Sequence, residues 1–274
     1  MQPLSTLLEQ ALQIAYQAGE QLKMFYQQKV NIKIKADDTP VTEADLAVSR
    51  FLTQALTHID PSIPVLSEEN CAIPLVKRQN WQRYWLIDPL DGTQQFIDRT
   101  DQFSVLIALI EQQRPVIGII HAPVLEQTFY AVKGHGAFFR HAQQVSQLNS
   151  QHSFDPARPI TIAVGKSTNQ TKVLAQLNPK FHYQFFTYGS SGLKSTLVAR
   201  QQCDCYIRLG DTGEWDTAAA ELILQESGGD IFTLTQQPLT YNQRETFVNP
   251  HFIMVGDRQW DWQQILLQQN IHRP

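Results

Sequence analysis

Apolar residues recur every three or four positions in two stretches near the start of the chain. The first runs from Leu4 to Leu22, and the second covers residues 42–57. This spacing puts the apolar side chains on one face of a helix. We therefore expect two amphipathic helices whose apolar faces pack against a core.

A different pattern follows, in which short apolar runs alternate with turn residues. Runs rich in β-branched and aromatic residues predict strands. Those expected in this part are Val65–Leu66, Tyr84–Ile87, Phe103–Ile110, Pro115–His121, Thr128–Val132 and Ala137–Arg140. The polar connections at 111–114 and 133–136 have hairpin length. A mostly antiparallel sheet carrying helices, an α+β arrangement, is the expected outcome.

Residues 141–159 are polar and contain few large apolar side chains, which makes them the best candidate for a boundary. Beyond them, expected strands alternate with helical stretches, as in an α/β arrangement. The strands are Ile160–Val164, Tyr183–Thr187, Cys203–Leu209, Asp230–Thr233 and Phe252–Val255. We predict an α+β half at residues 1–145 and an α/β half at 155–274.

Composition and charge exclude several classes of protein. The chain has 274 residues, 42% of them hydrophobic, and a formal net charge of −4. Nucleic-acid binding usually needs a basic surface, so it is not expected, whereas a small anionic substrate is compatible with local positive charge. No apolar run is long enough to span a membrane, and the N-terminus does not resemble a signal peptide.

The cysteines and the first helix indicate where in the cell the protein is expected to act. Cys71, Cys203 and Cys205 do not form a disulfide framework, which indicates a reducing compartment such as the cytoplasm. In one strand, Cys203 and Cys205 would face the same side, where packing is favoured over metal binding. The polar face of the first helix is rich in Gln rather than Lys or Arg, so peripheral association with the cytoplasmic face of the inner membrane is the weaker alternative.

The segment YWLIDPLDGTQQF, residues 84–96, carries the most chemistry. An apolar run leads to Asp88 and Asp91, and Pro89 and Gly92 lie in the turn around them. Two neighbouring buried carboxylates repel each other unless a cation lies between them, and Mg²⁺ prefers such all-oxygen ligands. A helix after Gly92 would add N–H groups for an anion. The same residues also suit an ordinary turn, so both interpretations stay open on this segment alone.

Further acidic residues could complete such a site. Glu68 and Glu69 follow a short strand, although a solvated surface pair is the simpler interpretation. Asp216 opens a helix, where it can be an N-cap, a metal ligand or both, because one carboxylate has two oxygens. Asp45 fits a capping box with Thr42, yet a carboxylate near a hydroxyl such as that of Thr93 could also hold an attacking water.

The segment Gly189-Ser190-Ser191-Gly192-Leu193-Lys194 begins another helical stretch. Small residues and free N–H groups at a helix start suit a phosphate or nucleotide, but a Gly/Ser loop with a capping serine is equally compatible. Lys194 and Arg200 are the nearest positive charges, and Lys166 and Arg208 are weaker candidates.

These motifs, taken in order, resemble those of the inositol monophosphatase superfamily of Mg²⁺-dependent, lithium-sensitive phosphatases. They are TPVTEAD, an E-E pair, DPLDGT, GSSGLK and WDTAA with a trailing G-G, and the similarity extends to Asn249-Pro250. Within the superfamily the chain looks most like the bacterial CysQ-type 3'(2'),5'-bisphosphate nucleotidases. Two positions depart from the usual pattern: Gln95, where an acidic residue is frequent, and Gly192.

The resemblance implies a layered αβαβα sugar-phosphatase-like fold and the hydrolysis of 3'-phosphoadenosine 5'-phosphate to AMP. It also implies two or three Mg²⁺ ions, with an inositol-1-phosphate or sugar phosphatase as the alternative activity. The implied metal ligands are Glu69, Asp88, the Leu90 carbonyl, Asp91 and Asp216. Asp45 and Thr93 would activate water. The implied substrate contacts are Glu69, Leu90, Asp91, Gly92, Thr93, Gly189, Ser190, Ser191, Lys194 and Asp216. The chain is expected to act as a monomer or homodimer.

Overall fold

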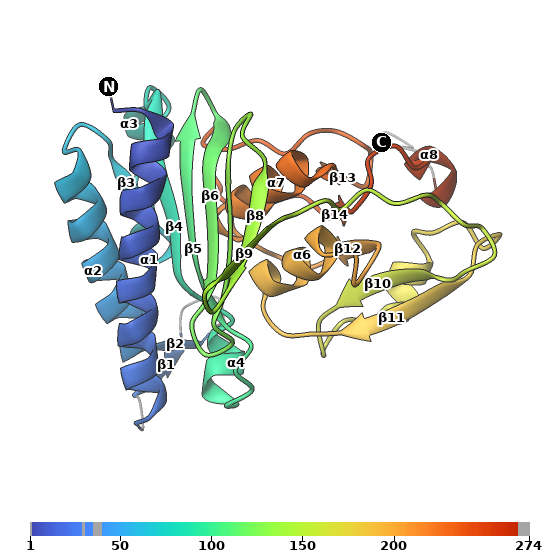
Figure 1. Cartoon of the computed structure of the whole chain (residues 1–274), viewed down its shortest axis with the longest axis horizontal. Helices are drawn as coiled ribbons and strands as arrows, with labels where there is room; N and C mark the ends of the chain where they lie inside the picture. The colour runs from blue at the N-terminus through green and yellow to red at the C-terminus, as the bar shows by residue number, and fades with distance from the viewer. Residues whose placement is uncertain (1, 29–30, 35–39, 268–274) are drawn as a thin grey trace.

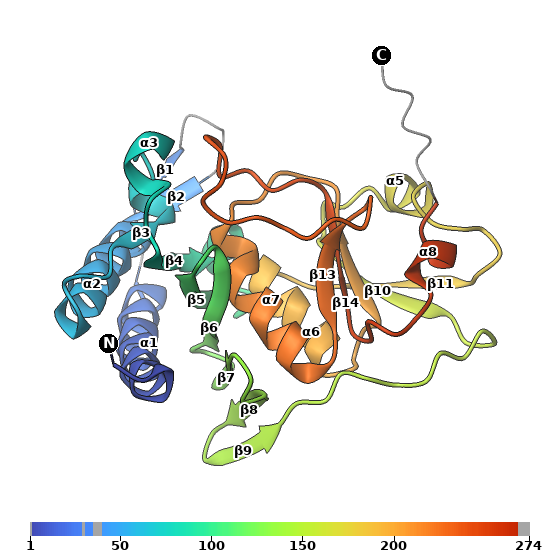
Figure 2. The same cartoon turned by 90° about the horizontal axis from the view of Figure 1, so that it is seen from above.

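The computed structural model describes residues 2–28, 31–34 and 40–267. Two sheets and three sets of helices stack into five layers (Figures 1 and 2). The helices are α1 (Leu4–Tyr26), α2 (Glu43–Ile59), α3 (Leu75–Arg78), α4 (Thr93–Ile97), α5 (Gln170–Leu174), α6 (Ser191–Ala199), α7 (Trp215–Ser227) and α8 (Trp262–Ile265), with a 3₁₀ turn at Glu68–Asn70. The expected αβαβα layering is confirmed.

The larger sheet has seven strands in the order β3-β4-β5-β6-β7-β8-β9. The strands are β3 (Val65–Ser67), β4 (Arg83–Asp91), β5 (Ser104–Glu111), β6 (Arg114–Ala122), β7 (Gln127–Val132), β8 (Ala137–His141) and β9 (Gln144–Gln147). Every pairing is antiparallel except that of β3 with β4. The mostly antiparallel sheet predicted from the hairpin connections is therefore present.

Alternation along β4 and β5 separates two cores. On β4, Trp85 and Ile87 pack with α1 and α2, whereas Tyr84 and Leu86 pack toward α6 and α7. Successive side chains of a strand point to opposite faces, so the nearly continuous apolar run of β4 serves both layers. The sheet is thus buried on both sides, with α1 and α2 covering its outer face (Figure 2).

Helix α7 lies between the two sheets, and its sequence reflects that position. Residues Thr217 to Leu224 are all buried, as expected for a helix that is apolar around most of its circumference. Its approach to β6 is close because Gly118 has no side chain. A Cβ at Gly118 would lie 2.6 Å from the Ala219 carbonyl oxygen. Helix α7 therefore joins the two predicted halves through a shared core.

The smaller sheet has five strands in the order β11-β10-β12-β14-β13. They are β10 (Ile160–Val164), β11 (Tyr183–Thr187), β12 (Cys205–Arg208), β13 (Asp230–Thr233) and β14 (Phe252–Val255). Pairings of β10 are parallel and those of β14 are antiparallel. Its outer face packs against α5 and α8, which form the fifth layer (Figure 2).

Several sequence expectations need correction. Strand β9 lies inside the polar stretch 141–159 and extends the larger sheet, and a short hairpin of β1 (Ile32–Ile34) and β2 (Pro40–Thr42) was missed. Cys203 precedes β12, so it packs in a different core cluster from Cys205 instead of sharing its face. Cys71, Cys203 and Cys205 do not form disulfides. Within the described ranges, no helix has the length and apolarity to cross a membrane.

Candidate active site

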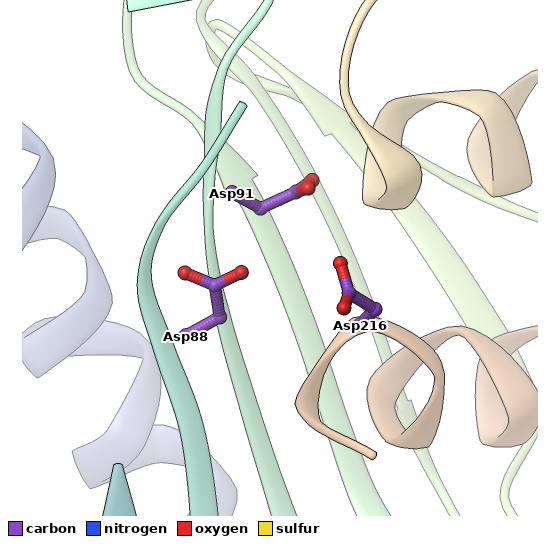
Figure 3. Close-up of side chains that lie close together, drawn as sticks. All are labelled: Asp88, Asp91 and Asp216. Atoms are coloured by element: carbon purple, nitrogen blue, oxygen red, sulfur yellow. The ribbon is translucent and has the colours of Figure 1, made fainter. Parts of the chain in front are cut away.

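A β-bulge at the end of β4 brings Asp88 and Asp91 together. Asp88 pairs with Leu106 and Asp91 with Ser104, so β4 contains one more residue than β5 over this interval. Residues three apart in a regular strand face opposite sides, and the extra residue re-aims one of them. Both carboxylates consequently lie on the side of β4 that faces Asp216, and the two residues are only 3% and 5% exposed (Figure 3).

Asp216 on α7 completes a cluster of three carboxylates. One oxygen from each of Asp88, Asp91 and Asp216 lies within 4.8 Å of the others (Figure 3). Asp216 is not the helix N-cap, as one interpretation of the sequence had it, because Glu214 occupies that position. Its Oδ2 accepts the Gly213 N–H at 2.6 Å. The amide of Asn249 in turn donates to the Gly213 carbonyl at 2.6 Å, so the NP segment fixes this loop.

The three carboxylates repel one another strongly in this position. Burial, followed by the charges of Glu68, Asp91 and Asp216, raises the pKa of Asp88 well above its usual value. Burial and the charges of Asp91 and Glu68 raise the pKa of Asp216 to about 8. A divalent cation removes this repulsion, and carboxylate oxygens are the donors that Mg²⁺ prefers. The donor set therefore fits the expected metal.

Of the two neighbouring glutamates, Glu68 is the one that lines the cavity beside these carboxylates. Glu68 lines the cavity above the carboxylates and its charge acts on Asp88 and Asp216, whereas Glu69 is not among the described residues that line it. Both residues lie in the 3₁₀ turn that follows β3. Successive residues of such a turn point in different directions, and the cavity lining favours Glu68 over the predicted Glu69 as a metal ligand.

Leu90 and Thr93 lie beside the carboxylates. The Leu90 amide donates to Asp88 Oδ1 at 2.9 Å, and its carbonyl accepts the Thr93 hydroxyl at 3.2 Å. A carbonyl has two lone pairs, so this one can still face a cation. Thr93 also reaches Asp45, with its hydroxyl 3.0 Å from Oδ1.

Asp45 forms the predicted capping box and also contacts Thr93. Its Oδ2 accepts both the N–H and the hydroxyl of Thr42, at 2.7 and 2.6 Å, in the predicted capping box of α2. Oδ1 remains for Thr93. Burial raises the pKa of Asp45, while the hydrogen bonds from Thr42 and Thr93 oppose that shift. One carboxylate therefore both caps a helix and orients the Thr93 hydroxyl.

The start of α6 does not present the free N–H groups that its sequence suggested. The N–H groups of Ser191 and Gly192 donate to Asp91, at 3.0 and 2.8 Å. The Gly189 N–H donates to the Gln102 side chain at 2.6 Å. Ser190 is the N-cap and its side chain also accepts the Leu193 N–H. The Ser191 and Gly192 donors therefore hold a carboxylate of the protein instead of a phosphate.

Two adjoining cavities meet at the carboxylates. One, of about 390 Å³, contains Glu68, Asp88 and Thr93 in its wall. The other, of about 480 Å³, contains Tyr188, Lys166 and Lys194. Both are lined by Asp91, Gly92, Gln94, Gln95, Arg208, Asp211, Thr212 and Asp216. The carboxylate cluster is therefore open to a larger neighbouring space.

The basic residues of the larger cavity differ from those favoured by the sequence. Arg200 stacks on Phe139, 4.4 Å from the ring centre, and does not line either cavity. Lys194 does, but it is buried and its ammonium donates to the Ser190 and Gly189 carbonyls. Burial lowers the pKa of Lys194 to about 8. Lys166 and Arg208, the weaker candidates by sequence, supply the positive charge.

This fold and carboxylate cluster belong to a known class of phosphatases. The family model described as the inositol monophosphatase family matches residues 3–270. The chain is therefore a member of that family, as its motifs indicated.

Particular relatives narrow the comparison. The 3'(2'),5'-bisphosphate nucleotidase CysQ of Haemophilus influenzae is 56% identical over 260 residues, covering 94% of this chain and 96% of the relative. CysQ of Salmonella typhimurium is 39% identical over 248 residues, covering 90% and 98%. The crystal structure of CysQ from Bacteroides thetaiotaomicron superposes with a TM-score of 0.77 at 31% identity, covering 92% and 97%.

Proposed function

We propose that this chain is a Mg²⁺-dependent 3'(2'),5'-bisphosphate nucleotidase that hydrolyses 3'-phosphoadenosine 5'-phosphate to AMP and phosphate. One observation carries the proposal: a buried cluster of three carboxylates shares a wall with a larger cavity lined by basic and aromatic side chains. The similarity to CysQ nucleotidases over nearly the whole chain supports the same substrate.

Two or three Mg²⁺ ions are proposed at Asp88, Asp91, Asp216, Glu68 and the Leu90 carbonyl. These oxygens surround the smaller cavity, and their mutual repulsion favours bound cations. When bound, Mg²⁺ supplies positive charge that acidifies water and neutralises phosphate oxygens. The protein contributes oxygens from three elements, namely β4, α7 and the 3₁₀ turn that carries Glu68.

Thr93 and Asp45 are proposed to hold the attacking water. With its proton directed to Asp45 Oδ1, the Thr93 oxygen has lone pairs that accept a hydrogen bond from water. Asp45 can then take up the proton that leaves the water, because its pKa is already raised by burial. Gly92, whose backbone has φ of 92°, lets the chain turn sharply into α4 at this point.

The larger cavity is proposed to hold the nucleoside and its 5'-phosphate. Lys166 and Arg208 lie in its wall with Tyr188 and Tyr206, a combination that suits an anion beside an aromatic base. Ser190, Ser191 and Lys194 line the cavity as well, and Gly189 precedes them. Inositol-1-phosphate has no base and no second anionic group, so it cannot make use of these aromatic and basic side chains. We propose a cytoplasmic location, in keeping with three cysteines that form no disulfide.

The test is a direct comparison of substrates. Phosphate release is measured from 3'-phosphoadenosine 5'-phosphate and from inositol-1-phosphate at equal concentrations, with the nucleotide product identified by chromatography. The proposal predicts preferential hydrolysis of the nucleotide with AMP as product. Preference for inositol-1-phosphate would retain the metal chemistry but reject the substrate, and release from neither would reject both.

A further inference from the structure

We infer that the N-terminal turn of α6 is a positioning device for Asp91, which holds one carboxylate oxygen so that the other faces the cation. The inference rests on the proposed Mg²⁺ site and assigns a role to the GSSG segment. It concerns Ser104, Ser190 and Gly192, which are not among the proposed metal ligands.

Four donors divide unequally between the two oxygens of Asp91. Oδ2 accepts the Ser190 hydroxyl at 2.7 Å, the Gly192 N–H at 2.8 Å and the Ser104 hydroxyl at 3.0 Å. Oδ1 accepts only the Ser191 N–H, at 3.0 Å. An ionised carboxylate has about four acceptor sites in total, so three donors occupy the capacity of Oδ2. Oδ1 is therefore the oxygen left for a cation.

Gly192 permits this approach because it has no side chain. A Cβ at this position would lie 2.9 Å from Asp91 Oδ2 and 2.7 Å from Leu106 Cδ2. Both distances are shorter than normal contacts, so a larger residue would displace the Asp91 carboxylate or the Leu106 side chain. The departure of the GSSGLK sequence at Gly192 thus has a structural reason.

Ser190 pays a conformational cost to make its contact. Its φ is 45° and its ψ is 150°, in a region that residues other than glycine rarely adopt. Strain of this kind persists where surrounding contacts impose it, and here Lys194 donates to the Ser190 carbonyl while the hydroxyl reaches Asp91. The turn is therefore held in place from both sides.

The arrangement has a consequence for metal affinity. Hydrogen bonds to a ligating carboxylate fix its direction, and losing such a bond typically weakens metal binding by about 10- to 100-fold. The donors come from β5 and α6, whereas Asp91 itself is on β4. Residues far from Asp91 in the sequence thus set the direction of one proposed ligand.

The experiment measures Mg²⁺ binding to the full chain by calorimetry, with no nucleotide present. Ser190→Gly removes the hydroxyl and relieves the strained φ, so we expect stability to be retained while the Mg²⁺ dissociation constant rises by about 10-fold. Ser104→Ala is expected to act in the same direction, and Gly192→Ala more strongly. A purely structural role would lower stability without this selective loss of affinity.

Ser195→Ala is the matched control. Ser195 is buried in the same helix, but its hydroxyl donates to the Gly192 carbonyl at 2.6 Å instead of to Asp91. We expect Ser195→Ala to bind Mg²⁺ as the wild type does. If Ser190→Gly and Ser104→Ala show the same affinity as this control, the inference is wrong. If the wild type itself does not bind Mg²⁺, the proposed Mg²⁺-dependent function is contradicted, and the inference that rests on it is contradicted with it.

Discussion

The Thr93 hydroxyl lies 3.0 Å from Asp45 Oδ1, although the two residues are 48 positions apart in the chain. Asp45 is on α2 and Thr93 is the first residue of α4, so this contact joins the helical layer to the end of β4. Because Thr42 occupies Oδ2, only Oδ1 is left to orient Thr93. The contact explains why a residue in a capping box belongs to the site.

Asp45→Asn should therefore separate capping from catalysis. An amide can keep its oxygen toward Thr42 and place its NH₂ toward Thr93, which would reverse the Thr93 hydrogen bond and remove the proton acceptor. We expect turnover to fall by about 10²- to 10⁴-fold, the usual contribution of general acid–base catalysis. The free energy of unfolding should change by only about 1 kcal/mol, because the cap is retained.

Asp60→Asn, at the other end of α2, is the control for the same chemical change, and its turnover should be unaltered. Adding Thr93→Val to Asp45→Asn should cost little more, since the two residues act as one unit. Additive losses in kcat for the double variant would contradict the pairing.

Glu68→Gln and Glu69→Gln form a matched pair that tests which glutamate acts. Glu68 lines the cavity and its charge acts on Asp88, so its loss should raise the Mg²⁺ concentration needed for half-maximal activity by about 10-fold. Glu69→Gln should have a smaller effect. A larger effect of Glu69→Gln would show that Glu69, and not Glu68, is the metal ligand.

Stability without metal should depend on pH in a defined direction. The pKa of Asp216 is raised to about 8, and that of Asp88 is raised in the same direction. The ordinary carboxyl pKa is about 3.9, so between these values the folded protein holds protons that the unfolded chain has released. The free energy of unfolding of the metal-free protein should therefore fall as pH rises through this window.

Mg²⁺ should counter that loss, so the rise in melting temperature on adding Mg²⁺ should grow from pH 5 to pH 8. Thermal melts in Mg²⁺ and in chelator measure this difference. Asp216→Asn should show a smaller pH dependence in chelator, because it lacks one of the titrating groups. A Mg²⁺ effect that is constant over this range would contradict the charge cluster.

Arg208 should discriminate between substrates with and without a 5'-phosphate. Arg208→Gln is expected to lower kcat/KM for 3'-phosphoadenosine 5'-phosphate by about 10- to 100-fold, the range for a hydrogen bond to a charged group. Activity on adenosine 3'-monophosphate should change much less. Arg200→Gln is the control, because Arg200 stacks on Phe139 outside both cavities. Equal losses on both substrates would show that Arg208 does not act on the 5'-phosphate.

The periodicity of the sequence was enough to predict the layers but not the short elements. Helices α1 and α2 and the strands of the larger sheet follow apolar patterns that burial imposes on both faces of β4 and β5. Strands β1 and β9 are exposed along their whole length, so no buried face marks them in the sequence. Cys203 was assigned to a strand because the apolar run at residues 205–207 follows it closely, although it lies in the turn before β12.

The sequence motifs predicted which residues lie at the site. They predicted less well the direction in which individual side chains and N–H groups point. Asp88, Asp91 and Asp216 come together as their motifs suggested, but the bulge that aligns Asp88 with Asp91 is a tertiary property of the β4–β5 pairing. Neighbouring Glu68 and Glu69 differ only in direction. The GSSGLK segment has the composition of a phosphate loop, yet Asp91 takes its N–H groups.

The most direct test of the central claim is the rate of AMP formation from 3'-phosphoadenosine 5'-phosphate by the wild type and by Asp88→Asn, each with Mg²⁺ and with chelator. Asp88→Asn keeps the volume of the side chain and removes one charge from the cluster. The account predicts Mg²⁺-dependent turnover by the wild type, loss of nearly all turnover in the variant, and an unchanged circular dichroism spectrum. Near-wild-type turnover by Asp88→Asn, or wild-type turnover that persists in chelator, would contradict it.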